Sequence, residues 1–260
     1  MQMTGERPDD RSSPDGLVAL HQAGYRELDR RIGGGLVLDV GCGVGFGTAS
    51  LLGSGRTVIG LDYDRGAAQV ASARWTGSGL SVLAGDGQAI PLAGRSVDWV
   101  TSSHIIEHFT DPERHVAELR RVLKPSGTAL ILTPNAPADF ENPFHVHPFT
   151  ANSLEALLRR SFDEVWVGGH DATPEVKADF AARRAQAAKV LRLDVLDLRH
   201  RLPRSWYIAA YSLGTRLFYR LQARRHAGGA TAITADDFST TDHVDDTTLS
   251  LFAVARRPRP

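Results

Sequence analysis

The fold of this 260-residue chain is decided by residues 36–47, which read Leu-Val-Leu-Asp-Val-Gly-Cys-Gly-Val-Gly-Phe-Gly. Apolar residues surround an acid, and glycines then recur at alternate positions, namely Gly41, Gly43, Gly45 and Gly47. This pattern is typical of a buried strand, a tight turn and a helix start, the opening of an α/β nucleotide-binding unit. Glycine suits the turn because it accepts positive φ angles and lets a ligand approach the backbone. The N–H groups at the start of the following helix would then face the ligand.

These glycines do not fit the dinucleotide pattern G-x-G-x-x-G. Counted from Gly41 and Gly43, the third glycine should be residue 46, which is Phe46. Counted from Gly43 and Gly45, it should be residue 48, which is Thr48. The chain instead has Asp-x-Gly-x-Gly-x-Gly, which starts at Asp39. A turn that binds no ligand is the alternative interpretation.

The next two predicted strands, 56–61 and 80–84, are each followed by an acid. Asp62 lies about twenty residues past the glycine turn, where a carboxylate can grip ribose hydroxyls, and Tyr63 beside it could stack on an adenine. Asp86, followed by Gly87, could accept a hydrogen bond from an adenine amino group. A helix N-cap for Asp62 and a turn role for Asp86 are the alternatives, and Asp64 is the better cap candidate.

Composition narrows the class of protein. Hydrophobic content of 42% and charged content of 23% are typical of a soluble globular chain. Thirty basic and thirty acidic residues cancel, so charge gives no case for nucleic-acid binding. We expect a cytoplasmic protein, because no apolar run reaches membrane-span length and residues 1–16 lack the apolar core of a secretory signal. The single cysteine, Cys42, excludes an internal disulfide and a cysteine-rich zinc site.

Five motifs follow one another at characteristic intervals: LDVGCGVG, GLDYD, GDGQAIPL, VDWVTSSHIIEH and ELRRVLKPSGTALILTPN. Together they resemble the class I S-adenosylmethionine (SAM)-dependent methyltransferases, most closely the small-molecule branch that includes ubiquinone-type enzymes. The resemblance covers residues 36–135 and implies SAM as the cofactor. The residues expected to bind it are Asp39, Gly41, Gly43, Gly45, Asp62, Tyr63, Asp86, Gly87 and His104.

The resemblance implies an α/β, Rossmann-like sheet of seven strands, the last one antiparallel, with a helical insertion before the final strand. We divide the chain into an N-terminal arm and helix (1–35) and a SAM-binding core (36–168). A helical basic insertion with an acidic loop (169–247) and the last strand with the tail (248–260) follow.

A narrower set of motifs lies outside the core. Thr4-Gly-Glu-Arg-Pro8, Asn142-Pro-Phe-His145, Thr234-x-x-Asp-Phe238 and Asp245-Asp-Thr-Thr-Leu-Ser-Leu251 occur together. This set resembles bacterial sugar and polysaccharide O-methyltransferases, including the type that acts in methylmannose polysaccharide synthesis. The chain departs from it at residues 146–148, Val-His-Pro, and in the basic insertion, which bears on the substrate more than on the reaction.

Methyl transfer from a sulfonium is an in-line displacement, which a base near the acceptor hydroxyl would assist. His145 is the first candidate for this base, because it lies in a Pro- and Phe-rich loop after the fifth strand, where ligands bind in such folds. Its alternative role is to order that loop. Glu107 and His108 are the other catalytic candidates, and they form either a structural pair or part of the acceptor pocket. Four other histidines are expected on helix surfaces or ends as bystanders: His21, His115, His200 and His226.

No metal ligands are assigned from the spacing. Some related sugar enzymes use a divalent ion such as Mg²⁺ to bind the acceptor, and Glu107, His108 and Asp139 are conceivable ligands here, but no tight spacing supports them.

The insertion is polarised in charge. Residues 174–225 hold 12 Lys or Arg against 4 Asp or Glu, and residues 227–255 hold 5 Asp and no basic residue. A basic amphipathic helix can contact an anionic membrane surface or an acidic ligand. A helical lid or a homodimer face is the alternative.

The sequence therefore predicts methyl transfer to a hydroxyl of a sugar or glycan, with a small-molecule or glycan acceptor and no nucleic acid as partner. A lipid, quinone or polyketide hydroxyl is the alternative acceptor. A catalytically silent SAM-binding partner is the alternative class.

Overall fold

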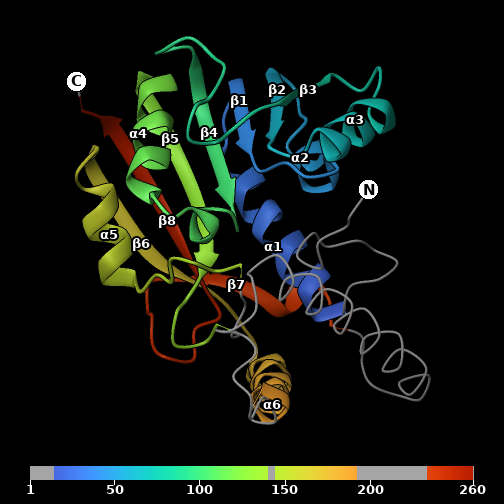
Figure 1. Ribbon diagram of the computed structural model, residues 1–260, viewed down its shortest axis with the longest axis vertical. Coiled ribbons are helices and arrows are strands. Elements are labelled where there is room, and N and C mark those ends of the chain that lie inside the picture. The colour runs from blue at the N-terminus through green and yellow to red at the C-terminus, as the bar shows by residue number, and fades with distance from the viewer. Residues whose placement is uncertain (1–14, 140–143, 192–232, 260) are drawn as a thin grey trace.

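The computed structural model describes residues 15–139, 144–191 and 233–259. In these residues the chain forms one eight-stranded sheet in the order β3-β2-β1-β4-β5-β8-β6-β7 (Figure 1). The first five strands along the chain are parallel: β1 (Gly35–Val40), β2 (Arg56–Asp62), β3 (Leu80–Ala84), β4 (Val97–Ser103) and β5 (Leu123–Pro134). β8 (Ser250–Pro258) lies antiparallel between β5 and β6 (Phe162–Ala172). The predicted α/β Rossmann-like sheet with an antiparallel last strand is confirmed.

The order of the parallel strands reverses between β1 and β4. The chain runs outward from β1 to β2 and β3, then returns to β4 on the other side of β1 and continues to β5. In open α/β sheets, ligands bind in the crevice that such a reversal leaves at the carboxyl ends of the strands. The glycine turn after β1 and His104 after β4 both lie at this edge.

Helices cover both faces of the sheet because alternate strand residues point to opposite sides. On one face, Leu38 and Ile131 pack with the apolar stripes of α4 (Pro112–Val122) and α5 (Ala151–Leu158). Figure 1 shows these two helices close together. On the other face, Val37 and Leu130 pack with Leu28 of α1 (Asp15–Arg31). The remaining helical segments are α2 (Phe46–Ser50), α3 (Arg65–Arg74), α6 (Pro174–Leu191), and the 3₁₀ turns η1 (Ile106–His108) and η2 (Ala235–Asp237).

Local chemistry explains where the helices start. Asp111 accepts a hydrogen bond from the N–H of Arg114, and Pro112 occupies the first turn of α4. Asp64 caps α3 by accepting from the N–H groups of Gly66 and Ala67. The carboxylate of Asp62 is therefore not needed as the cap of α3.

The sheet has one strand more than the seven predicted. β7 (Phe238–Thr241) lies inside the segment expected to be a helical insertion, and β6 continues to Ala172 to pair with it. This edge strand was missed because it is only four residues long and has a single large apolar residue, Phe238. The segment 192–232, which holds most of the basic stretch, lies outside the described residues, as do the motif residues 4–8 and 142–143. The lid, dimer and membrane expectations therefore stay predictions.

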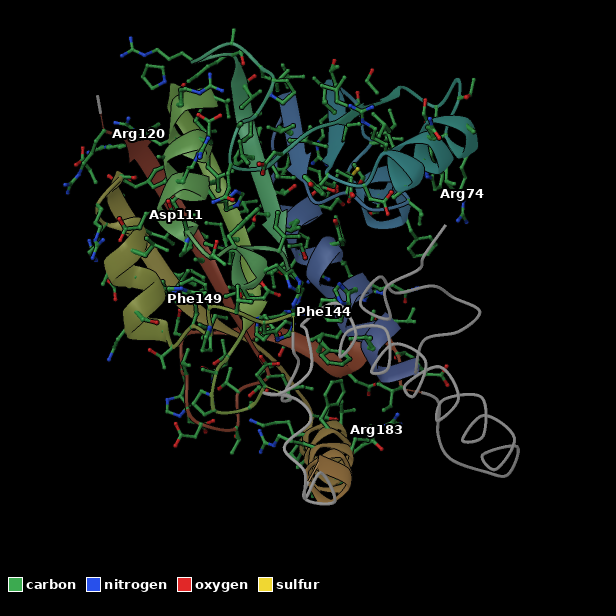
Figure 2. The ribbon with its side chains drawn as sticks, in the orientation of Figure 1. Arg74, Asp111, Arg120, Phe144, Phe149 and Arg183 are labelled. Atoms are coloured by element: carbon green, nitrogen blue, oxygen red, sulfur yellow. The ribbon has the colours of Figure 1, made fainter. Side chains whose placement is uncertain are left out.

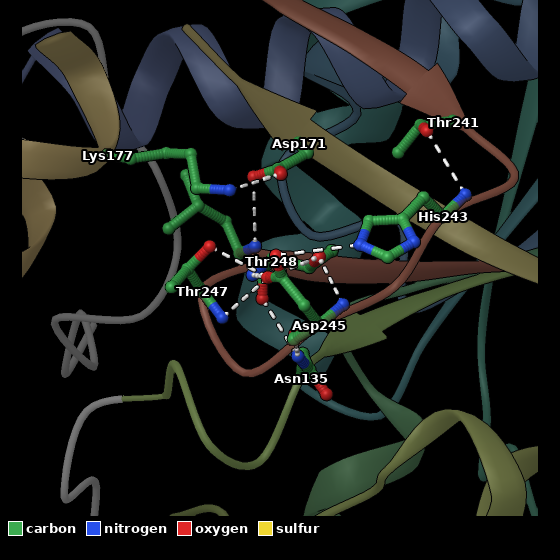
Figure 3. A network of polar contacts seen from close by, with 9 residues as sticks. Asn135, Asp171, Lys177, Thr241, His243, Asp245, Thr247 and Thr248 are labelled. Atoms are coloured by element: carbon green, nitrogen blue, oxygen red, sulfur yellow. Dashed lines mark hydrogen bonds and ion pairs between the residues drawn. The ribbon is translucent and has the colours of Figure 1, made fainter. Parts of the chain in front are cut away.

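The loop before β8 is fixed by a polar network (Figure 3). The side-chain amide of Asn135, at the end of β5, donates to the carbonyls of Asp245 and Thr248 at 2.9 and 3.0 Å. Asp245 accepts from the Thr247 hydroxyl and from the backbone N–H groups of Thr247 and Thr248, and these bonds lower its pKa to about 2. Lys177 of α6 pairs with Asp171 of β6 at 2.6 Å. Much of the acidic segment expected to be irregular is thus anchored to the sheet.

Candidate active site

A cavity of about 710 Å³ opens at the point where the strand order reverses. Its floor is the glycine turn, and its walls are the segments that follow β2, β3 and β4. Helix α1 closes one side through His21, Gln22 and Tyr25. The cavity therefore contains most of the residues that the sequence assigned to cofactor binding, and it reaches His104 and His108 at its far end.

The glycine turn has the backbone geometry that the sequence predicted. Gly41, Gly43 and Gly45 have φ angles of 84°, 55° and 79°, in the region that favours glycine. A Cβ atom at Gly41 would lie 2.3 Å from Cγ2 of Ile105, so the turn passes directly beneath the segment that follows β4. This close approach leaves bare backbone facing the cavity.

Asp39 does not line the cavity but supports the turn from below. It is fully buried, and its carboxylate accepts from the hydroxyls of Thr101 and Thr48 at 2.6 Å each. The hydroxyl of Tyr25 donates to the same group at 3.0 Å. Burial raises the pKa of Asp39, and the three hydroxyl donors stabilise its charged form. Asp39 thus joins β1 to β4, α2 and α1.

Asp62 lies at the end of β2, only 6% exposed, and lines the cavity. Its Oδ2 accepts from the N–H of Gly43 at 2.7 Å, and its Oδ1 accepts from the N–H of Asp64 at 2.9 Å. The carboxylate therefore holds the glycine turn and the β2 end in one geometry. Tyr63, next to it, is 81% exposed and lies at the cavity wall, where its ring is accessible to a planar ligand.

The loop after β3 is held in place by His115. Asp86 Oδ1 accepts from the N–H of Gln88, which is the turn role, while Asp86 and Gly87 also line the cavity. His115 was expected on a helix surface but is completely buried. Its Nδ1 lies 2.9 Å from the carbonyl of Gly87 and its Nε2 lies 3.0 Å from the Ser102 hydroxyl.

Both ring nitrogens of His115 are satisfied by a neutral imidazole, with Nδ1–H donating to the carbonyl and Nε2 accepting from the hydroxyl. Burial lowers the pKa of His115 to about 4. The sequence did contain a signal for this position. Residue 115 is four before Leu119 and three after Pro112, so it belongs to the buried stripe of α4.

Histidines also line the far end of the cavity. His104 has a φ angle of 53° and its ring centroid lies 4.5 Å from that of His21 on α1. Burial lowers the pKa of His104 well below its usual value and that of His21 to about 4. His21 was expected to be a bystander and is instead part of the cavity wall.

The structure brings together the three residues that the sequence assigned to catalysis. Glu107 is 2% exposed, and its Oε1 lies 3.9 Å from Nε2 of His108. The rings of His108 and His145 have centroids 5.1 Å apart. Burial raises the pKa of Glu107 to about 7. The Asp139 carboxylate, 2.6 Å from Nδ1 of His145, completes the group.

Backbone contacts fix the loop that carries His145. The N–H groups of Val146 and His147 both donate to the carbonyl of Glu107, at 2.9 and 3.0 Å. Nδ1 of His108 lies 3.0 Å from the carbonyl of Phe144. Figure 2 shows Phe144 on the side of α1 and Phe149, in the same loop, on the side of α5. His108 and His145, which are 37 positions apart in the chain, are thereby held next to each other.

Two comparisons of the sequence with known proteins find similarity to methyltransferases. A family model described as "Methyltransferase domain" matches residues 38–131. A probable S-adenosylmethionine-dependent methyltransferase of Mycolicibacterium smegmatis is 38% identical over 151 residues, 56% of this chain and 58% of that protein. A demethylmenaquinone methyltransferase of Renibacterium salmoninarum is 32% identical over 123 residues, 47% of this chain and 48% of that protein. The chain thus spans about half the length of the curated relatives it matches.

A solved structure shows the same fold over most of the chain. It is a SAM-dependent methyltransferase of Thermotoga maritima, described as a possible histamine N-methyltransferase. The TM-score is 0.58, with 92% of this chain and 90% of that chain covered at 16% identity. At this identity the likeness concerns the fold alone. Among the helices of the described residues, none combines the length and the apolar character needed to cross a bilayer.

Proposed function

We propose, on the premise that residues 38–131 are a class I SAM-dependent methyltransferase domain, that this protein methylates a hydroxyl of a sugar or glycan. The observation that carries the proposal is the continuity of the site. One cavity runs from the glycine turn and Asp62 to His108, behind which lie Glu107 and His145. A donor pocket and a group of acid–base side chains therefore meet at the end of β4.

The residues of the turn fit the methyl donor. Backbone at Gly41 and Gly43 is exposed to the cavity, Asp62 presents a carboxylate for ribose hydroxyls, and Asp86 lies where an adenine amino group would be recognised. SAM supplies an electrophilic methyl group on a sulfonium. Because an in-line displacement depends mainly on alignment, the rigid turn and the buried support beneath it would account for much of the rate.

On the acceptor side, His145 is the candidate base. Its Nδ1 is bound to Asp139 Oδ2 at 2.6 Å, which fixes the ring and favours Nε2 as the atom that takes a hydroxyl proton. A carboxylate partner also stabilises the imidazolium that forms. Glu107 and His108, next to it, would bind the remaining polar groups of the acceptor.

A quinone hydroxyl is the second candidate acceptor. One of the relatives is a demethylmenaquinone methyltransferase, 32% identical over 47% of this chain. The cavity wall offers apolar side chains, including the aliphatic Ile105 and the aromatic Phe109, that suit a quinone ring as well as a sugar. The polar group at Glu107, His108 and His145 favours the sugar.

The test combines calorimetry with an acceptor panel. The protein is titrated with SAM, and then incubated with SAM and sugars, oligosaccharides, quinols and lipids, with mass spectrometry to detect a methyl gain. Methylation of a sugar, lost in His145→Ala while SAM binding persists, supports the proposal. Methylation of a quinol alone would overturn the sugar assignment, and SAM binding without any methylated acceptor would favour a silent partner.

A further inference from the structure

Three donor side chains converge at the far end of the cavity. Glu107, His108 and His145 each offer one ligand atom, and these atoms lie within 4.8 Å of one another. Glu107 is almost completely buried, yet its Oε1 accepts no hydrogen bond from any residue that the structure describes. A buried carboxylate oxygen without such a bond is unfavourable unless another group compensates it. A cation bound between the three side chains would do so.

The contacts around the three side chains are those of a metal site. Nδ1 of His108 faces the carbonyl of Phe144 at 3.0 Å, which leaves Nε2, 3.9 Å from Glu107 Oε1, directed at the carboxylate. Metal-binding histidines usually donate their second N–H to a carbonyl or carboxylate, because this fixes the tautomer and the ring orientation.

The other two side chains are held in the same way. Nδ1 of His145 is bound to Oδ2 of Asp139 at 2.6 Å. Oε2 of Glu107 accepts from the Thr133 hydroxyl at 3.0 Å, so Oε1 is the oxygen turned toward the histidines. Asp139, which sequence reasoning considered as a ligand, instead orients one. All three donors are thus positioned by a hydrogen bond on their second polar atom.

We propose that Glu107, His108 and His145 bind a divalent first-row transition metal, with Zn²⁺ the best match. Two imidazoles and one carboxylate suit Zn²⁺, Co²⁺ or Fe²⁺, whereas Mg²⁺ prefers oxygen ligands only. Three protein ligands with a fourth position open are typical of catalytic rather than structural zinc. His108 lines the cavity, so the open position would be reached by a ligand entering there.

The role of the cation rests on the proposed function. A bound divalent ion polarises a coordinated hydroxyl and orients it, which would place the acceptor oxygen for methyl transfer. With the cation in place, His145 would be a ligand and would not take the proton. Coordination would acidify the acceptor hydroxyl, whose proton would pass to water in the open cavity, and the oxygen would then take the methyl group as the bond from the methyl carbon to the sulfonium sulfur breaks. Metal binding itself requires neither SAM nor acceptor.

The experiment measures Co²⁺ binding to the full chain after treatment with a chelator. Co²⁺ replaces Zn²⁺ in such sites and absorbs visible light. Its absorption bands are stronger when the ion has four ligands than when it has six. We expect one Co²⁺ per chain, with affinity at least tenfold lower in Glu107→Gln, His108→Asn and His145→Asn. Asp139→Asn should lower it about 10- to 100-fold, the usual effect of losing the partner of a ligand. Competition by Zn²⁺, but not by Mg²⁺, should abolish the bands.

His147→Asn is the matched control, since it removes an imidazole from the same loop and should leave Co²⁺ binding unchanged. SAM calorimetry on every variant shows that the donor pocket is intact. Absence of stoichiometric Co²⁺ binding, or binding that Glu107→Gln leaves unchanged, would overturn the metal site. Methyl transfer that survives complete chelation would overturn its catalytic role but leave the proposed function standing. Lack of methyl transfer by a chain that binds metal as expected would overturn the proposed function alone.

Discussion

The buried imidazole of His115 makes the stability of the protein depend on pH in a predictable way. Its pKa is about 4 in the folded chain against an ordinary value of 6.5, because burial penalises the charged form. Between these values the unfolded chain binds a proton at this residue and the folded chain does not. The free energy of unfolding therefore falls as the pH is lowered from 6.5 to 4, and it levels off below that.

The size of the effect follows from the shift. One pKa unit corresponds to about 1.4 kcal/mol, so a difference of about two and a half units amounts to about 3 kcal/mol over the window. His115→Asn removes the titration while its amide can still donate to the Gly87 carbonyl. Loss of the Ser102 contact would lower the stability of this variant by about 1 kcal/mol at every pH, a constant offset that does not contribute to the difference in pH dependence between the two proteins.

The assay is urea unfolding of the wild type and His115→Asn, followed by tryptophan fluorescence at several pH values between 7.5 and 4. His21, whose pKa is also lowered to about 4, titrates in both proteins and cancels in the comparison. The wild type should lose about 3 kcal/mol more than the variant between pH 6.5 and 4. Parallel curves across this range would refute the assignment of a buried, neutral His115.

Three further changes address the site itself. Asp62→Ala should weaken SAM binding about 10- to 100-fold in calorimetry, because the turn loses a charged hydrogen-bond acceptor. The control is Asp64→Ala, which removes the cap of α3; it should lower the unfolding free energy by about 1 kcal/mol and leave SAM affinity unchanged. Gly47→Ala should lower the unfolding free energy by about 1–3 kcal/mol, since its Cβ would lie 2.2 Å from the Tyr25 ring, and a Tyr25→Ala background that fails to relieve this loss would contradict the clash. His145→Ala should retain SAM affinity and lose most turnover, and unchanged turnover with the true acceptor would argue against any catalytic role for this ring.

The glycine turn and the ends of the parallel strands could be predicted because their requirements are local. The alternate glycines of the turn are needed for positive φ angles, and the structure has them at Gly41, Gly43 and Gly45. Asp62 is the last residue of β2, whose apolar run can be recognised in the sequence. The end of a parallel strand determines at which edge of the sheet the carboxylate lies. The eighth strand could not be predicted in the same way, because β7 is a polar edge strand that exists only through pairing with β6.

The histidines of α1 and α4 show a different limit. His21 and His115 were both assigned to helix surfaces, since a polar residue on an amphipathic helix is normally solvated. His115 is completely buried because Gly87 and Ser102, from other parts of the chain, satisfy both of its ring nitrogens. His21 is only partly covered, by the ring of His104, and lines the cavity. Helical spacing places His115 on the apolar stripe, but only the fold supplies the carbonyl that makes a histidine tolerable there.

The grouping of Glu107, His108 and His145 depends on contacts between segments that are distant in the chain. Nothing in the spacing of Glu107 and His108 points to His145, because the loop that carries it returns to η1 through backbone bonds to the Glu107 carbonyl and through the contact of His108 Nδ1 with the Phe144 carbonyl. The two backbone bonds use N–H groups of Val146 and His147, so they place no requirement on these two side chains. The position of His145 opposite Glu107 is therefore the feature on which both the base and the metal assignments depend.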